Sequence, residues 1–168
     1  MLRERGTESI EHPGGTLYAH LIRVYERLHG AGPELQHAAL AHAAYGTDGF
    51  DVVLFDHRNR DPLRALVGPR SETLIHRYGG CDRSASWARL AETGQVRSRF
   101  DDRIETLTSS ELRDFVDLSI VNELDVVEQS ATIAEKYGAY FRKLFDDWRP
   151  LASPPVSADA DAVLAPWR

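Results

Sequence analysis

Two histidines stand out because their positions on expected helices turn them towards the interior. His20 lies on the apolar stripe of an amphipathic segment, one turn from Leu17 and Val24. His42 lies in a second segment, which is almost entirely small and apolar. Neutral imidazoles on rigid elements are common ligands of zinc, iron and related metals, whereas a single inward histidine is more often a hydrogen-bonded core residue. The pair therefore predicts either a metal site or a buried hydrogen-bonding unit.

A third histidine, His12, falls in a turn just before the first of these segments and could supply a further metal ligand. Three protein ligands with an open coordination position are typical of catalytic rather than structural metals. On spacing alone, a solvated loop histidine is favoured. His29 and His37 are expected to face water, and His37 lies about 140° around its helix from His42.

The elements that must position these residues are helical, because apolar residues recur at helical spacing along most of the chain. The expected helices cover residues 17–30, 33–45, 60–67, 71–78, a long segment opening at residue 108, and 131–148. Thr16 is suited to cap the first helix, and Thr108 with Glu111 forms a capping-box pattern. Alternation between Val96 and Thr106 predicts a β-hairpin. The expected fold class is all-α, a helical bundle with one short β-hairpin.

Residues 1–150 are expected to form one helical domain, since 168 residues suffice for a single core. The segment 151–168 is rich in Pro, Ala, Ser and Asp and is expected to be a flexible tail that adds little to the fold. Its prolines argue against a continuous helix. Its few apolar residues leave room for docking on a partner subunit, which would make a homodimer.

The composition argues against several classes of function. Acidic residues outnumber basic ones, 26 to 20, and the net charge of −6 disfavours a nucleic-acid partner, which would need a basic surface. No apolar run approaches the length of a membrane span, and the charged start lacks the apolar core of a signal peptide. The single cysteine, Cys81, cannot form a disulfide within the chain, which favours a reducing, cytoplasmic location. The expected partner is a small-molecule substrate.

The segment Leu40–Thr47 resembles the helix end of HD-domain proteins, where a His-Asp pair is followed shortly by a glycine and a polar residue. His20 matches the first histidine of that superfamily, and Asn122 stands where it usually has the aspartate of an Ala-Asp dipeptide. An uncharacterised family of bacterial HD-like proteins is more similar still, over residues 11–129. Its recurring motifs correspond here to His12, Thr16–Leu21, Ala41–Thr47, Gly68 with Glu72, Asp82-Arg83, Arg99-Phe100 and Asn122–Leu124.

The resemblance implies an HD-like bundle with one divalent metal ion (zinc, iron or manganese) held by His12, His20, His42 and Asn122. Two departures from the HD pattern restrict this site. Ala43 replaces the aspartate that holds and often bridges two metals, and Asn122 binds through its carbonyl oxygen without bringing charge. A neutral site without a bridging carboxylate disfavours a two-metal mechanism. It favours a single metal, or a site reused for binding.

Five further polar residues lie near the ends of elements that the resemblance covers. Tyr45 and Asp82 are the candidates for moving a proton in catalysis. Thr47, Arg83 and Arg99 are the candidates for substrate binding, since an arginine can hold a carboxylate or phosphate through two parallel hydrogen bonds. The alternative for each arginine is a surface ion pair.

Three functions are consistent with these features. The first is a metal-dependent hydrolase or lyase, in which one metal activates a water to act on a small, anionic metabolite. The second is an iron-dependent oxygenase, as in the oxygenase branch of the HD superfamily. The third is a degenerate HD-like domain that binds a ligand or partner without chemistry. Metal content and metal identity would distinguish them.

Overall fold

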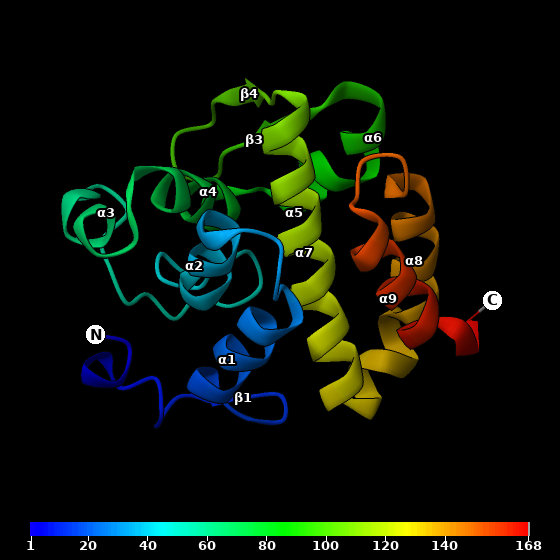
Figure 1. Ribbon diagram of the computed structural model, residues 1–168, viewed down its shortest axis with the longest axis horizontal. Coiled ribbons are helices and arrows are strands. Elements are labelled where there is room, and N and C mark those ends of the chain that lie inside the picture. Colours follow the sequence, from blue (N-terminus) through cyan, green and yellow to red (C-terminus); the bar gives the residue numbers. More distant parts are fainter. Residues whose placement is uncertain (168) are drawn as a thin grey trace.

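One long helix organises the molecule. The computed structural model describes residues 1–167, and in it α7 (Ser109–Gln129) runs through the middle (Figure 1). On one side α7 contacts α1 (Leu17–Arg27), α2 (Pro33–Ala41) and α4 (Pro69–Gly80). On the other side it contacts α8 (Ala131–Trp148) and α9 (Pro154–Val163). Helix α7 is therefore buried around most of its circumference, and its polar residues reach interior sites.

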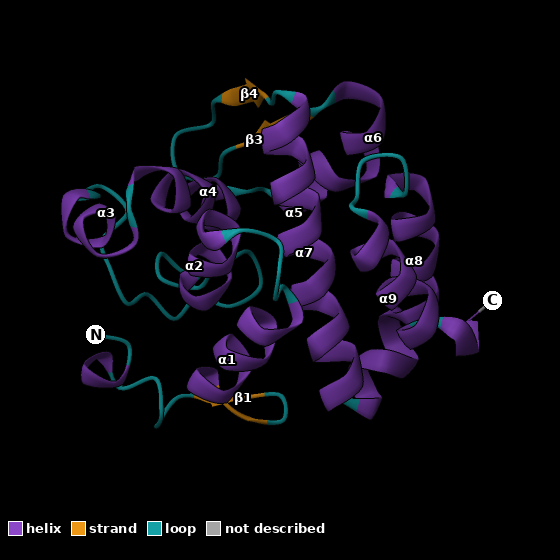
Figure 2. Cartoon of the chain, viewed as in Figure 1, coloured by secondary structure: helices purple, strands orange, loops and turns teal. Residues whose placement is uncertain are grey.

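The predicted fold class is confirmed: the described chain is mainly helical, with very little strand (Figure 2). The shorter helices are α3 (Asp61–Val67), α5 (Arg83–Ser86), α6 (Leu90–Thr93) and the 3₁₀ turns Arg3–Arg5, Trp87–Arg89 and Ala165–Trp167. The predicted hairpin is present as β3 (Gln95–Arg97) paired antiparallel with β4 (Ile104–Thr106). The predicted turn before α1 is present, and it joins a second hairpin, β1 (Glu11–His12) with β2 (Gly15–Thr16).

The sequence signals at helix starts are confirmed, whereas two helix ends differ from the prediction. The Thr16 side chain accepts a hydrogen bond from the backbone of Ala19, and Thr108 with Glu111 forms a complete capping box. Helix α1 ends at Arg27, and α2 ends at Ala41 rather than near residue 45. After Ala41 the chain continues in turns, in which Ala44 N–H donates to the Ala41 carbonyl and Gly46 N–H to the Ala43 carbonyl, and the Ala44 carbonyl accepts from the backbone of residues 54 and 55.

The prediction of a flexible tail from residue 151 is wrong for the described part of that segment. Residues 154–163 form α9, whose first two positions are prolines. Proline is well suited to the first turn of a helix, where its missing N–H has no partner to lose. Val156, Ala160 and Leu164 are buried, and Asp117 of α7 accepts a hydrogen bond from Ser153 at 2.9 Å. The segment therefore belongs to the core, while Arg168 lies outside the described residues.

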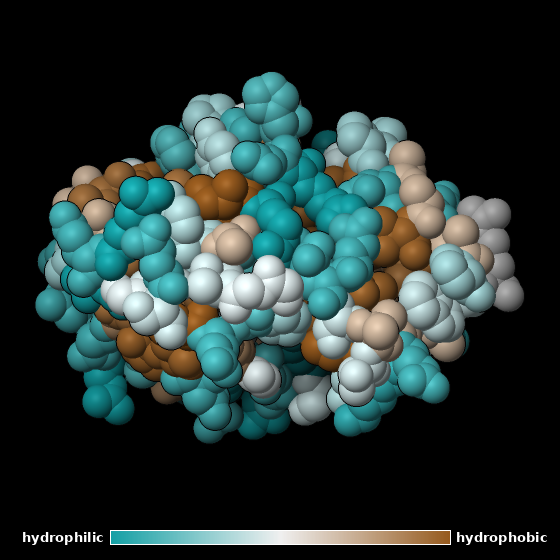
Figure 3. Space-filling model, turned by 90° about the horizontal axis from the view of Figure 1, so that it is seen from below, coloured by the Kyte–Doolittle hydropathy of each residue, from teal (hydrophilic) through white to brown (hydrophobic). Residues whose placement is uncertain are grey.

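The surface gives no sign of a membrane-spanning element. Among residues 1–167, no helix combines the length and the apolar character needed to cross a membrane. Hydrophobic residues form separate patches between polar ones on the face shown in Figure 3.

Candidate metal centre

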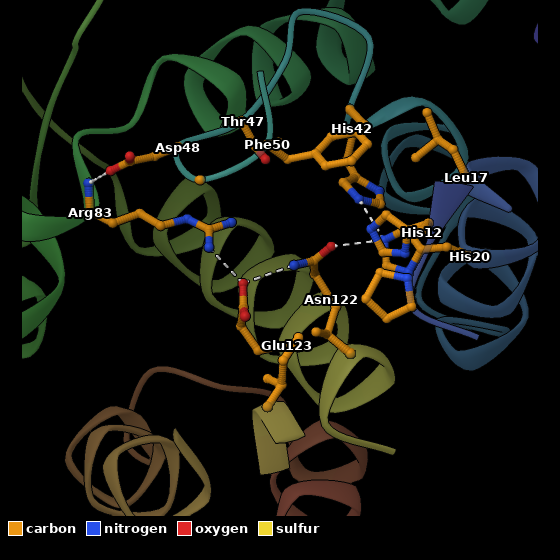
Figure 4. A pocket seen from close by; sticks show the side chains of 15 residues that line it. His12, Leu17, His20, His42, Thr47, Asp48, Phe50, Arg83, Asn122 and Glu123 are labelled. Carbon is orange, nitrogen blue, oxygen red and sulfur yellow. Dashed lines mark hydrogen bonds and ion pairs between the residues drawn. The ribbon is translucent and has the colours of Figure 1, made fainter. Parts of the chain in front are cut away.

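Three side chains from three helices meet in the interior of the molecule (Figure 4). His20 of α1 is 0% exposed, and His42, the residue that follows α2, is 1% exposed. Their Nε2 atoms are 3.2 Å apart, and His20 Nε2 is 3.0 Å from Oδ1 of Asn122 on α7. The apolar stripe of α1 turns His20 inward, as its spacing predicted. His29 and His37 are exposed, also as predicted.

The outer nitrogens of the two imidazoles determine where their protons lie. His42 Nδ1 donates to the backbone carbonyl of Ala39 at 2.7 Å, and His20 Nδ1 donates to Asp125 Oδ2 at 2.6 Å. A carbonyl and a carboxylate accept hydrogen bonds only, so each Nδ1 carries a proton. In a neutral imidazole the other nitrogen then has a free lone pair. When His20 is neutral, the two Nε2 lone pairs therefore face each other.

The amide of Asn122 adds a third acceptor to this contact. Its Nδ2 donates to Glu123 Oε1 at 2.8 Å, which leaves Oδ1 directed at His20. Three acceptor atoms therefore converge without a hydrogen between them, unless His20 carries a second proton. Two donors each about 2.1 Å from one metal lie about 3.0–3.4 Å apart, a range that includes both separations from His20 Nε2. The residues present fit a single divalent cation.

His12 lies beside this contact rather than within it. Its ring stacks on that of His20 with centroids 4.0 Å apart, and its edge meets Phe50. Nδ1 of His12 is buried and has no hydrogen-bond partner within residues 1–167. Burial, and next the nearby His20, lower the pKa of His12 to about 4 and that of His42 to about 3. Both rings are therefore neutral near pH 7, which is the form that binds metals.

Two residues that sequence reasoning missed hold His20 in place. Asp125, buried on α7, accepts from His20 and from Arg23, whose Nε and Nη2 lie 2.6 and 2.9 Å from the carboxylate. Burial raises the pKa of the Asp125 carboxyl, but these hydrogen bonds lower it further, to below its ordinary range. The spacing contains a signal for both, because Arg23 follows His20 by three residues and Asp125 follows Asn122 by three.

A cavity of about 200 Å³ opens beside the histidines, and Thr47, Asp48, Arg83 and Glu123 are among its lining residues (Figure 4). Thr47 and Arg83, two of the predicted substrate-binding residues, therefore lie in the same cavity as the histidines. The charge of Arg83 is already matched, because Nη1 lies 2.8 Å from Glu123 Oε1 and Nη2 donates to the Tyr78 hydroxyl at 3.0 Å. Glu123 had no predicted role.

The other three predicted site residues do not line this cavity, and each makes a different contact in the described structure. Tyr45 is 1% exposed and donates to Glu72, because α2 ends early and turns the ring away. Asp82 caps α5 by accepting from the backbone of Ala85. Arg99 is exposed and donates to the carbonyl of Gly79 at 2.8 Å.

The donor set has an unusual composition for a metal centre. Among residues 1–167, no group of three or more His, Cys, Asp or Glu side chains is arranged to hold a metal ion. The convergent donors are instead two imidazoles and one amide oxygen. None of these three donors carries a negative charge.

Comparison with known proteins gives one similarity. Residues 1–83 match the model of a family described as a domain of unknown function (DUF6817). No curated protein and no solved structure matches the chain. The matched segment includes His12, His20 and His42, whereas Asn122 and its neighbours on α7 lie beyond it.

Proposed function

We propose that His20, His42 and Asn122 hold one divalent metal ion, with His12 beside it, and that the protein is a metal-dependent enzyme. A metal held there would supply an activated water for the hydrolysis of, or an elimination from, a small anionic metabolite. The observation that carries the proposal is the convergence of Nε2, Nε2 and Oδ1 at 3.2 and 3.0 Å, with each Nδ1 already used as a donor.

The contacts around the imidazoles support this proposal. Metal-binding histidines usually donate their second N–H to a carboxylate or a backbone carbonyl, which fixes the tautomer and the ring. His20 has the first arrangement with Asp125, and His42 has the second with Ala39. Imidazoles with an oxygen donor suit zinc, iron or manganese.

The neutral donor set supports an anionic substrate. Because no ligand in the set carries a negative charge, a bound divalent cation keeps its full charge and attracts an anion. The metal would also lower the pKa of a bound water towards neutrality. Within the cavity, Thr47 offers a hydroxyl to a substrate, whereas the carboxylates of Asp48 and Glu123 bind the backbone N–H and the guanidinium of Arg83. The histidines have the roles of holding the metal and excluding water from its protein side.

The resemblance to HD-domain proteins is part of the same proposal. Histidines from two consecutive helices and a polar residue in the middle of a later helix meet at one place, as that resemblance implies. Ala43 is buried at the cavity wall and brings no carboxylate, which supports one metal rather than two. An iron-dependent oxygenase would use the same residues, and the identity of the bound metal separates the two reactions. A cytoplasmic location belongs to the proposal as well, since the only cysteine, Cys81, is free and buried.

Metal analysis of the untagged protein, purified without chelator, tests the proposal. We expect about one divalent ion per chain, lost in His20→Ala and in His42→Ala while both variants stay folded. His29→Ala, just after α1, and His37→Ala, in α2, change exposed histidines close to the same two helices and should keep the metal. His12→Ala should lose it in part.

The opposing interpretation is a buried hydrogen-bonding pair with no metal. It predicts no metal in the wild type and a loss of about 1–3 kcal/mol of stability when either partner is removed. Equal metal content in wild type, His20→Ala and His42→Ala would refute the metal centre.

A further inference from the structure

The direction of the Asn122 amide depends on its neighbour Glu123. Nδ2 of Asn122 donates to Glu123 Oε1 at 2.8 Å, while Oδ1 faces His20 Nε2 at 3.0 Å (Figure 4). The two ends of an amide have opposite hydrogen-bonding character. If the amide turned by half a rotation, its NH₂ group would donate to the lone pair of His20. Such a rotation would satisfy the histidine and remove an oxygen ligand at the same time.

Glu123 is held in its turn by Arg83. Nη1 of Arg83 lies 2.8 Å from Oε1 of Glu123, the same oxygen that accepts from Asn122. The guanidinium is fixed by the Tyr78 hydroxyl at 3.0 Å and by the Trp87 ring, whose centroid is 4.5 Å away. Because the Glu123 side chain is 7% exposed, Arg83 also supplies the charge that keeps a buried carboxylate in place.

We propose that Arg83 and Glu123 form a positioning relay that holds the Asn122 amide oxygen towards the two imidazoles. The relay keeps the amide oxygen of Asn122 beside the two Nε2 atoms, as binding of a cation requires. It also prevents the Asn122 NH₂ group from donating a hydrogen bond to His20. Glu123 and Arg83 are positioning residues in this scheme, since both act through Asn122. The inference rests on the proposed metal centre, but its own contacts exist without the metal.

Substitutions at residue 123 separate the effect of the Asn122 amide orientation from the effect of the Glu123 charge. Glu123→Ala removes the acceptor and frees the amide, so metal affinity should fall by about tenfold or more. Glu123→Gln removes the charge but keeps one carbonyl oxygen, which can accept from both Asn122 and Arg83 as Oε1 does. We expect its affinity to stay within about threefold of the wild type, well short of a typical loss for such outer contacts. Glu128→Ala, an exposed acidic residue on the same helix, is the matched control.

A rescue variant distinguishes positioning from packing. In Asn122→Asp combined with Glu123→Ala, residue 122 offers an oxygen whichever way it rotates, so the relay is no longer needed. Cobalt(II) titration reports the affinity, and the visible absorption of the bound cobalt reports its ligands. We expect the double variant to recover affinity and a cobalt spectrum with oxygen ligation. Wild-type affinity in Glu123→Ala, an equal loss in Glu123→Gln, or no recovery in the double variant would overturn the relay.

A second measurement needs no metal. The chain has only two asparagines, Asn59 and Asn122, so the side-chain NH₂ signals of ¹⁵N-labelled protein are few and assignable by Asn122→Asp. In the wild type and in Glu123→Gln, the Asn122 NH₂ protons should be shifted and slow to exchange with water. In Glu123→Ala their shift and their exchange rate should both change. An unprotected Asn122 NH₂ group in the wild type would overturn the relay even if Glu123→Ala failed to fold. Absence of metal binding in the wild type would instead count against the proposed function, and these signals would then decide the relay.

Discussion

Two buried polar clusters lie on the same side of α7 and are built in opposite ways. The Glu72 cluster consists of Glu72, Tyr45, Arg60 and Arg64. Both oxygens of the Glu72 carboxylate are used: Arg60 binds them at 2.7 Å each, Tyr45 donates to one at 2.8 Å, and Arg64 donates to the other at 3.2 Å. Every hydrogen bond in it runs from a donor to an acceptor. The Glu72 carboxylate is therefore fully satisfied within the protein, although Nε of Arg64 is buried without a partner among residues 1–167.

The histidine cluster consists of His12, His20, His42 and Asn122, and acceptors face acceptors within it. The outer atoms of His20, His42 and Asn122 all have partners, whereas their inner atoms converge with no donor unless a proton is added to His20. An unmatched buried acceptor costs about 1–3 kcal/mol. The contrast teaches that burial and polarity alone do not mark a functional site. The unmatched set is the one that calls for a ligand.

The largest expected effect on stability comes from breaking the Glu72 cluster. Glu72→Ala leaves Arg60 and Arg64 without their carboxylate and Tyr45 without its acceptor. We expect a loss of about 3 kcal/mol, at the lower end of the range for a broken buried pair because both arginines reach solvent. Chemical denaturation measures it, with Glu92→Ala on the surface as the control. Metal content per folded molecule should not change, and its loss would show that the two clusters are coupled.

The next effect concerns the histidine cluster. A metal bound there should increase the free energy of unfolding. A cation that binds only the native state, at one hundred times its Kd, adds about 2.7 kcal/mol to the free energy of unfolding. We expect this increment in the wild type and in Glu72→Gln alike, and none in His42→Ala. Thermal or chemical unfolding with and without zinc or manganese measures it. An equal increment in His42→Ala would place the bound metal elsewhere.

A smaller effect is expected from Tyr45→Phe. The substitution removes one hydrogen bond to a charged carboxylate, which is worth about 1.5 kcal/mol, while Arg60 and Arg64 still satisfy Glu72. Because Tyr45 lies in the Glu72 cluster, metal affinity and any metal-dependent turnover should be unchanged. A drop in turnover with intact stability would return Tyr45 to the catalytic role that the sequence suggested.

The smallest effect, for each pH unit, concerns how acid lowers the free energy of unfolding. The two clusters should differ in the pH at which this happens. Burial and the nearby His20 lower the pKa of His42 to about 3, against an ordinary value of 6.5. Between these values the unfolded chain binds more protons than the native protein, so stability present above pH 6.5 is lost as the pH falls. The slope cannot exceed about 1.4 kcal/mol per pH unit for this histidine.

The Glu72 cluster should respond only at lower pH. Burial raises the pKa of the Glu72 carboxyl, but hydrogen bonds from Arg60 and Tyr45 lower it further, to below its ordinary value of 4.5. Its contribution is therefore lost as the pH falls below 4.5. Unfolding of the metal-free protein at pH 6.5 and pH 5 should show a smaller decrease for His42→Gln than for the wild type. Equal decreases would contradict the buried, neutral state of His42.

Local patterns predicted much of the fold. Helix α8 has the predicted bounds, and Thr16 and Thr108 cap α1 and α7 as expected. Each of these signals acts between residues within about one turn, so the sequence reveals it directly. The prediction for the tail is wrong because prolines break a helix in its interior but suit its first turn. Only the packing of α9 on α7 and α8 shows that the second case applies.

Leu17 and Val24 mark the buried stripe of α1, so the sequence alone predicts that His20 faces the interior. It did not determine which polar residues His20 would meet. Asn122 and Asp125 lie 102 and 105 residues away along the chain and reach it only because α7 crosses α1. In the same way, Tyr45 and His42 are close in sequence, yet they have different partners after the end of α2. Tyr45 donates to Glu72, whereas His42 contacts His20. Residue types and helix faces are local properties, whereas the matching of donors with acceptors is decided by tertiary packing.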